Sequence, residues 1–236
     1  MGSSLDWIRN NISRDLNGFA VDLPGHGKSL DLSPEAYQFT NVAGLLRESL
    51  LNAGVSEMDL VGYSMGGRIA LGFTRRFPDM VRHLVLESTS PGLVSHQERK
   101  LRAELDAERA ELLRSDQNLF QREWLDMDLF SSLRTKTEIR DMLIRERYNG
   151  SATEWARALE SLSPAEHPDF RSWLARTSTA ATCITGALDR KYTRIACDLN
   201  RKNKRIRHIS VQDAGHNVHL EQPGMYLRIL QEILIE

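Results

Sequence analysis

The pentapeptide Gly62-Tyr63-Ser64-Met65-Gly66 constrains the fold of this chain more than any other part of the sequence. The mostly apolar residues 58–63 predict a strand, and residues 66–77 predict a helix that stops before Pro78. A strand, a tight Gly-x-Ser-x-Gly turn and a helix, in this order, present a serine hydroxyl at the end of a strand. We therefore interpret Ser64 as a nucleophile, and the motif as more than a glycine-rich surface turn.

Strands and helices alternate along most of the chain. Further strands are predicted at 18–23, 81–87, 180–186 and 206–212, and further helices at 34–53, with Ser33 as cap, 192–203 and 226–235. The first three strands largely lack a polar face, as expected when helices cover both sides of a parallel sheet. We predict the α/β class and, with the serine turn, the α/β-hydrolase fold: a mostly parallel sheet with flanking helices and an inserted helical cap.

The block from 95 to 163 differs from its surroundings, because it is rich in Arg, Glu, Leu and Ala and predicts helices only. We expect a core formed by 1–94 and 167–236 and a cap formed by 95–166, which lies over the active face. One side of the first cap helix is expected to be apolar through Leu101, Leu105, Leu112 and Leu113.

Composition restricts the class of partner. The 236 residues carry a net charge of −1, with 41% hydrophobic and 27% charged residues, which is typical of a globular protein that binds neither nucleic acid nor membrane. No signal peptide or spanning segment is evident. Cys183 and Cys197 lie in largely apolar stretches and are expected to be buried, inert thiols. The predicted location is the cytoplasm.

A serine nucleophile needs a base and an acid that orients the base, and in this fold they follow in the order Ser, Asp, His. Asp189 comes directly after the predicted strand 180–186, and His216 follows the next strand. Both residues therefore reach the sheet edge that carries Ser64. His219 is the competing base, and we favour His216 because Gly215 allows a tight approach.

Other polar residues have simpler interpretations. We interpret His26 as a turn residue rather than a second base, and Asp22 as the carboxylate that anchors the same turn. No metal-ligand spacing and no phosphate-binding glycine loop occurs, so we predict no metal and no organic cofactor.

Several blocks resemble one family, the menaquinone-pathway synthases of 2-succinyl-6-hydroxy-2,4-cyclohexadiene-1-carboxylate. The blocks are 21–29, 60–68, 87–93, Tyr148-Asn149-Gly150 in the cap and 214–217, and together they span essentially the whole chain. The blocks around Ser64 and His216 are shared by many α/β hydrolases. Arg68 after the double glycine, the Ser-Pro-Gly-Leu run and the cap Asn-Gly are more specific.

The resemblance implies a lyase that removes pyruvate from a cyclohexene substrate with three carboxylates. It implies carboxylate-binding roles for Arg68, Arg102 and Arg145, and pocket-lining roles for the aromatic residues Tyr63 and Trp124. Guanidinium groups bind carboxylates bidentately, so an arginine-lined lid suits a small polyanionic substrate. Ser64, Asp189 and His216 would form the triad, and the Met65 N–H would be an oxyanion donor.

The resemblance also predicts a segment ahead of this sequence. Family members begin with roughly 25 residues of early strands and a His-Gly-Phe turn, which supplies an oxyanion donor. Gly2-Ser3-Ser4-Leu5-Asp6-Trp7 matches the stretch that follows that turn. We therefore expect a late start site or a truncated chain, in which an interior strand beside 58–63 is missing and activity is impaired.

Two other function classes remain open. One is a serine esterase, thioesterase or C–C hydrolase that uses the same triad, although the arginine-rich cap is poorly suited to lipid-like acyl groups. The other is a catalytically silent binding protein of the same fold, which the expected loss of the first strands would favour.

Overall fold

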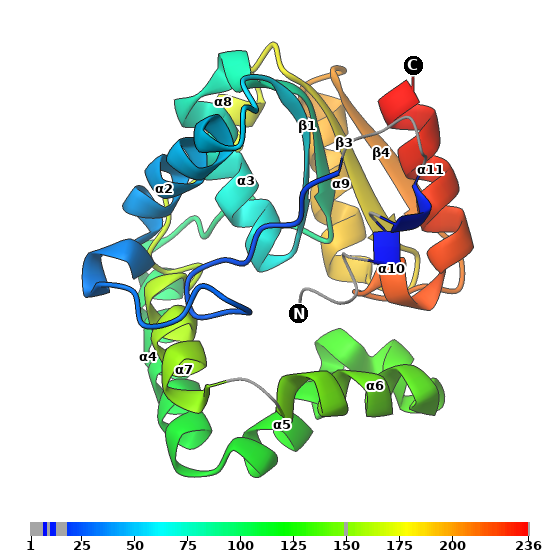
Figure 1. Ribbon diagram of the computed structural model, residues 1–236. Helices are drawn as coiled ribbons and strands as arrows, with labels where there is room; N and C mark the ends of the chain where they lie inside the picture. Colours follow the sequence, from blue (N-terminus) through cyan, green and yellow to red (C-terminus); the bar gives the residue numbers. More distant parts are fainter. Residues whose placement is uncertain (1–6, 9, 13–17, 149–150, 236) are drawn as a thin grey trace.

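The computed structural model describes residues 7–8, 10–12, 18–148 and 151–235. Four strands form the described sheet, and each neighbouring pair of strands is parallel. The strands are β1 (Met58–Tyr63), β2 (Val81–Glu87), β3 (Ala180–Gly186) and β4 (Ile206–Val211), side by side in that order (Figure 1). Parallel pairing brings the ends of all four strands to one edge of the sheet, and the loops that follow them meet there.

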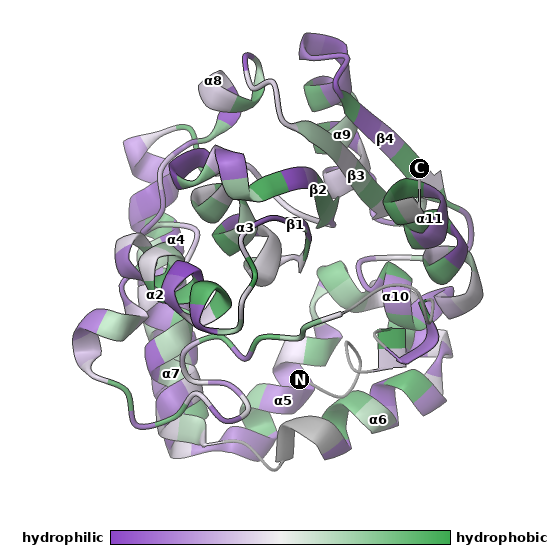
Figure 2. Cartoon of the chain, turned by 45° about the horizontal axis from the view of Figure 1, so that its top comes forward, coloured by the Kyte–Doolittle hydropathy of each residue, from purple (hydrophilic) through white to green (hydrophobic). Residues whose placement is uncertain are grey.

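Helices cover both faces of this sheet. One face packs against α2 (Phe39–Asn52), α3 (Met65–Arg76), α8 (Arg171–Leu174) and α9 (Arg190–Lys202), and the other against α10 (Val218–Glu221) and α11 (Pro223–Ile235). Successive side chains of a strand point to opposite faces of the sheet. On β2, Leu84 and Leu86 therefore pack on the face that carries α2 and α3, while Val85 packs on the face that carries α11. β3 runs through the middle as a largely hydrophobic strand (Figure 2). This two-sided burial is that of the predicted α/β architecture.

The described residues of the block 95–163 lie mostly in helices, as expected, and these helices gather beyond one end of the sheet (Figure 1). They form α4 (His96–Ser115), α5 (Gln117–Asp126), the 3₁₀ segment η3 (Asp128–Thr135), α6 (Thr137–Tyr148) and α7 (Ala152–Ser161). Polar caps start three of these helices. Ser95 and Glu98 form a capping box at α4, Asp116 caps α5 and Ser151 caps α7. In the described ranges no helix combines the length and hydrophobicity needed to cross a bilayer.

The buried face of α4 differs from the expected one. Leu113 is buried, but Leu101 and Leu105 are 55% and 41% exposed. The buried stripe instead runs through Asp106, Ala110 and Leu113, spaced four and three residues apart. The leucine pattern was misleading because the stripe begins with an acid, which a search for apolar periodicity passes over.

Strands β1, β2 and β3 have the predicted bounds, but the predicted strand 18–23 is wrong. This segment forms no strand, and its Phe19 and Val21 are 61% and 44% exposed. A strand is stabilised by a neighbour that accepts and donates its backbone hydrogen bonds. β1 pairs only with β2, so the other edge of β1 is free of strand partners in the part of the chain that the structure describes.

The predicted helix 34–53 is split in two. A 3₁₀ turn, η1 (Pro34–Tyr37), comes first, and α2 starts only at Phe39. Gln38 lies between them in an extended conformation, with φ −67° and ψ 129°, which interrupts the helical hydrogen bonds. Ser33 precedes η1 but makes no side-chain capping bond.

The two cysteines do not share one environment. Cys183 is buried in the core on β3, and burial raises its pKa to about 12, so this thiol is inert as predicted. Cys197 is exposed, and its sulfur lies 3.4 Å from His208 Nδ1. The expectation of burial is wrong for Cys197 because its position on α9 faces outward.

Candidate active site

Ser64 lies on the tight turn between β1 and α3, with the strained backbone angles φ 48° and ψ −106°. Close packing explains two nearby glycines. A Cβ on Gly62 would lie 2.7 Å from the Gly66 carbonyl oxygen, and one on Gly67 would lie 1.9 Å from Thr89 Oγ1. A Cβ on Gly66 would meet nothing within 4 Å. The turn therefore needs small residues at 62 and 67, whereas position 66 has space for a side chain.

The structure brings Ser64, His216 and Asp189 together. His216 Nε2 lies 3.1 Å from Ser64 Oγ, and His216 Nδ1 lies 2.7 Å from Asp189 Oδ2. Since a carboxylate only accepts, Nδ1 carries the proton, and Nε2 is left to accept the hydroxyl proton of Ser64. Asp189 Oδ1 accepts from the Tyr192 N–H at 3.2 Å and thereby caps α9. The hydrogen bond to Oδ1 thus fixes the Asp189 carboxylate, which in turn orients His216.

Three aromatic rings hold His216 in place, and the histidine is only 1% exposed. Their centroids lie 5.4 Å away for Tyr63, 5.8 Å for Phe130 and 4.7 Å for Tyr192. Tyr63 also donates its hydroxyl to Asn217, the next residue in the histidine loop. Sequence reasoning had placed Tyr63 in the substrate pocket and had missed the other two. The position of Tyr192, three residues after Asp189 in the first helical turn, was the available signal.

The competing base His219 is engaged elsewhere. Its backbone N–H and ring Nδ1 lie 3.0 Å and 2.8 Å from the Glu87 Oε1 atom, and Glu87 is fully buried at the end of β2. This contact ties the loop that carries His216 to the central sheet. The geometry gives His219 an anchoring position and leaves His216 beside Ser64.

Met65 is the first residue of α3, so its N–H has no acceptor within the helix. The helix N-terminus adds partial positive charge at the same place. Stabilisation of a developing negative charge by the Met65 N–H stays a prediction.

Two of the three predicted arginines lie near this site. Arg68 is one turn beyond Ser64, is 8% exposed and donates from Nη2 to the Leu162 carbonyl at 2.9 Å. Its Nε is buried and finds no acceptor among the described residues. Burial lowers the Arg68 pKa to about 10, and the charge of Arg102 acts in the same direction. Arg102, on α4, donates from Nε to Asp106 Oδ2 at 2.7 Å.

Arg145 is not brought to the site by any contact of the described residues. It lies on α6 with an exposed side chain. The adjoining motif residues Asn149 and Gly150 fall outside the described ranges. A carboxylate-binding role for Arg145 therefore stays a prediction.

Trp124 belongs to an aromatic row in the cap that reaches the triad. The Arg109 guanidinium lies 5.6 Å from the centroid of the Trp124 ring, and the centroid of the Phe130 ring lies 6.2 Å from it. Phe130 in turn contacts His216. Trp124 is thus one ring removed from the base, and substrate contact by Trp124 stays a prediction.

The turn at 22–29 agrees with its structural interpretation. Asp22 Oδ2 accepts from the Lys28 N–H at 3.0 Å, and His26 Nδ1 lies 3.1 Å from the Pro24 carbonyl oxygen. Both side chains stabilise the turn on which they lie.

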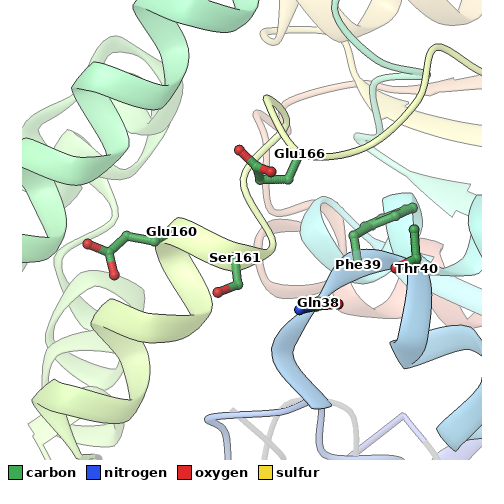
Figure 3. Close-up of a pocket in the computed structure, with 6 residues that line it drawn as sticks. All are labelled: Gln38, Phe39, Thr40, Glu160, Ser161 and Glu166. Atoms are coloured by element: carbon green, nitrogen blue, oxygen red, sulfur yellow. The ribbon is translucent and has the colours of Figure 1, made fainter. Parts of the chain in front are cut away.

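The structure has a surface pocket that none of the three triad residues lines. Its volume is about 490 Å³, and it lies where the start of α2 faces the end of α7 (Figure 3). It is lined by Gln38, Phe39, Thr40, Glu160, Ser161 and Glu166. Within the described ranges no cluster of three or more His, Cys, Asp or Glu side chains is arranged to hold a metal ion. Hydrogen bonding, and not cavity size, therefore identifies the candidate active site.

Comparison with known proteins gives a consistent result. The sequence model of the alpha/beta hydrolase fold family matches residues 1–223. A 2-succinyl-6-hydroxy-2,4-cyclohexadiene-1-carboxylate synthase from Enterobacter sp. (strain 638) is 34% identical over 216 residues, which cover 91% of this chain and 80% of the relative. The synthase of that name from Escherichia fergusonii is 32% identical over 221 residues, 93% of this chain and 84% of the relative. The solved structure of MenH from S. aureus superposes with a TM-score of 0.85 at 27% identity and covers 91% and 81% of the two chains.

Proposed function

The chain belongs to the 2-succinyl-6-hydroxy-2,4-cyclohexadiene-1-carboxylate synthase family within the α/β-hydrolase fold, and on this premise we propose a lyase activity in menaquinone biosynthesis. The proposed reaction eliminates pyruvate from 2-succinyl-5-enolpyruvyl-6-hydroxy-3-cyclohexene-1-carboxylate. The product is 2-succinyl-6-hydroxy-2,4-cyclohexadiene-1-carboxylate. No metal or organic cofactor takes part in this proposal.

Proton abstraction starts the proposed reaction. His216, held by Asp189 and acting with Ser64, removes the ring proton next to the succinyl ketone. The electron pair moves through the ring double bond and breaks the carbon–oxygen bond to the enolpyruvyl group. The leaving group departs as the enolate of pyruvate, which takes up a proton and becomes pyruvate. Atoms balance without water, so the reaction is an elimination and not a hydrolysis.

Two groups stabilise the charge that develops during this step. The Met65 N–H, at the start of α3, faces the enolate oxygen in the proposed pose. The imidazolium that forms on His216 is stabilised by the Asp189 carboxylate at 2.7 Å.

The observation that carries the proposal is the pair Arg68 and Arg102. Arg68 lies on α3 one turn beyond Ser64, and Arg102, on the cap helix α4, is close enough to influence the pKa of Arg68. Arg68 keeps a buried Nε without an acceptor in the described part of the chain, a feature that a bound carboxylate would explain. The positive electrostatic potentials of two neighbouring guanidinium groups add. The pair therefore favours a polyanion such as a tricarboxylate over a neutral acyl substrate.

A serine hydrolase is the second candidate, because a Ser64–His216–Asp189 relay is also what acyl transfer to water requires. The two candidates differ in product. Pyruvate release from the tricarboxylate, measured by coupling to lactate dehydrogenase, is expected for the lyase. Hydrolysis of short p-nitrophenyl esters at a much higher kcat/KM than this elimination would favour the hydrolase, and the absence of both activities would favour a binding protein.

The proposal also includes a cytoplasmic location. Both cysteines are free thiols, as expected in a reducing compartment. Fractionation of cells that express the tagged chain would test this location.

A further inference from the structure

Asp106 is a fully buried acid in the middle of the arginines of the cap, and no role has been assigned to it so far. Its two oxygens have three partners. Oδ2 accepts from Arg102 Nε and from Ser163 Oγ, each at 2.7 Å, and Oδ1 lies 3.4 Å from Arg109 Nη1. A buried carboxylate persists only when such partners compensate its charge.

The way in which Asp106 holds Arg102 leaves the other end of that guanidinium available. Asp106 takes the Nε edge, while Nη1 and Nη2 donate to no group among the described residues. A guanidinium binds a carboxylate bidentately through two parallel N–H groups, and these two nitrogens form such a pair. Arg102 is 29% exposed at its side chain, so an incoming anion has access to it.

Arg68 is close enough to this pair to respond to both charges. Arg102 lowers the Arg68 pKa, whereas Asp106 raises it. Arg68 lies on the first turn after Ser64, and its buried Nε has no hydrogen-bond partner among the described residues. Asp106 therefore holds Arg102, on the cap helix, close to Arg68, on the core helix.

We propose that Asp106 is a positioning residue, which orients the free end of the Arg102 guanidinium so that Arg102 and Arg68 bind carboxylates of one substrate. This inference rests on the proposed function and deepens it, because it identifies the part of the site that selects a polyanion. Ser163 completes the arrangement. It comes from the segment that follows α7, so its bond to Asp106 also ties the end of the cap to its first helix.

Electrostatics alone predicts the opposite effect on binding. Asp106 is a negative charge beside a site for anions, so its removal by Asp106→Asn should tighten anion binding if charge is all that matters. If Asp106 positions Arg102, the same substitution should weaken binding, because Arg102 loses its charged partner and a defined orientation. If Asp106 served only folding, the substitution would leave the Kd of the anion unchanged for the folded fraction of the protein.

The test measures citrate, a tricarboxylate probe, by isothermal titration calorimetry with the full chain. We expect Asp106→Asn to raise the Kd of citrate by about 10-fold, the loss of roughly one charge-assisted contact. In an Arg102→Ala background, the same change should have almost no further effect, since the acid acts through that arginine. Ser163→Ala, which leaves all arginines intact, should weaken citrate binding by about 3-fold and serves if Asp106→Asn does not fold.

The matched control is Glu104→Gln, which removes an equal charge from an exposed position on the same helix and should leave the Kd of citrate within about 2-fold. Equal or tighter citrate binding by Asp106→Asn, or a wild-type chain that binds no citrate, would overturn the inference. Pyruvate release is measured separately with the wild-type chain. A chain that binds citrate as expected but releases no pyruvate contradicts the proposed function and not the role of Asp106.

Discussion

Phe130 of the cap meets the ring of His216 edge-on, with centroids 5.8 Å apart and an interplanar angle of 78°. The cap therefore touches the proposed base directly. A second link lies close by, since Glu221 accepts from Ser132 Oγ and from the Asn217 N–H in the histidine loop. The position of the cap and the orientation of the base are thus determined by shared contacts.

The ion pair that completes this second link should contribute to stability. Lys136 Nζ lies 2.8 Å from Glu221 Oε2, and the carboxylate is completely buried. We expect Lys136→Met to lower the free energy of unfolding by about 1–3 kcal/mol, because it leaves a buried charge partly unpaired. Urea denaturation measures this change. Adding Glu221→Gln should recover part of the loss, and a double variant less stable than Lys136→Met would contradict this explanation.

Substitution of the proposed triad should abolish turnover without unfolding the protein. Ser64→Ala, Asp189→Asn and His216→Ala are each expected to reduce kcat by orders of magnitude, and the triple variant should be little worse than the poorest single one. Steady-state kinetics with circular dichroism as a folding control tests this. His219→Gln is the informative comparison: if it abolishes turnover in a stable protein while His216→Ala does not, the base is His219.

The arginine of the core should discriminate between anionic and neutral substrates. Arg68→Ala is expected to raise the KM for the tricarboxylate by roughly 10- to 100-fold, with a much smaller effect on a neutral p-nitrophenyl ester. Increasing salt should raise the same KM. Arg75→Ala, which changes an exposed arginine on the same helix, is the control. Equal losses on both substrates would mean that Arg68 serves the fold.

Stability should fall in mild acid because of His167. This histidine is fully buried, and burial together with the charge of Arg68 lowers its pKa from 6.5 to about 4. The unfolded chain therefore takes up the proton first as pH falls, and neutral His167 contributes stability that is complete above pH 6.5 and lost between pH 6.5 and 4. The contribution is about 3 kcal/mol.

A comparison of unfolding free energies at pH 7 and pH 4.5 tests the role of His167. His167→Gln should make the difference between the two values smaller by about 2–3 kcal/mol. His96→Gln, at an exposed position, should leave the difference unchanged. An unchanged difference in His167→Gln would show that other groups produce the loss in acid.

Local sequence patterns predicted the parts of the fold that depend on local physics. The turn at Ser64, the strand 81–87 and the placement of Asp189 and His216 after successive strands follow from periodicity and chain order, and the structure agrees. The segment 18–23 has the composition of a strand, but a strand also requires a partner, which composition does not supply. A local sequence pattern therefore could not predict that this segment would remain unpaired.

The surroundings of the site were less predictable because they depend on tertiary contacts. Phe130 reaches His216 from the cap, and nothing in its sequence neighbours indicates that meeting. Tyr192 reaches His216 from α9, and its position three residues after Asp189 is the only local signal of this contact. Asp106 was overlooked because an acid in an Arg- and Glu-rich helix looks like a solvated charge. In the structure Asp106 is buried and accepts a hydrogen bond from Ser163, which lies 57 positions further along the chain.

The free edge of β1 has a consequence for local motion next to Ser64. β2 and β3 have strand neighbours on both sides, whereas β1, which leads into the serine turn, has one. Amide hydrogens that point away from β2 exchange with solvent through small openings rather than through global unfolding. In hydrogen–deuterium exchange, alternate amides of β1 should therefore lose protection long before those of β3. The strand that carries the proposed nucleophile would then be more labile than the two interior strands, held in place mainly by β2 and by the packing of α3.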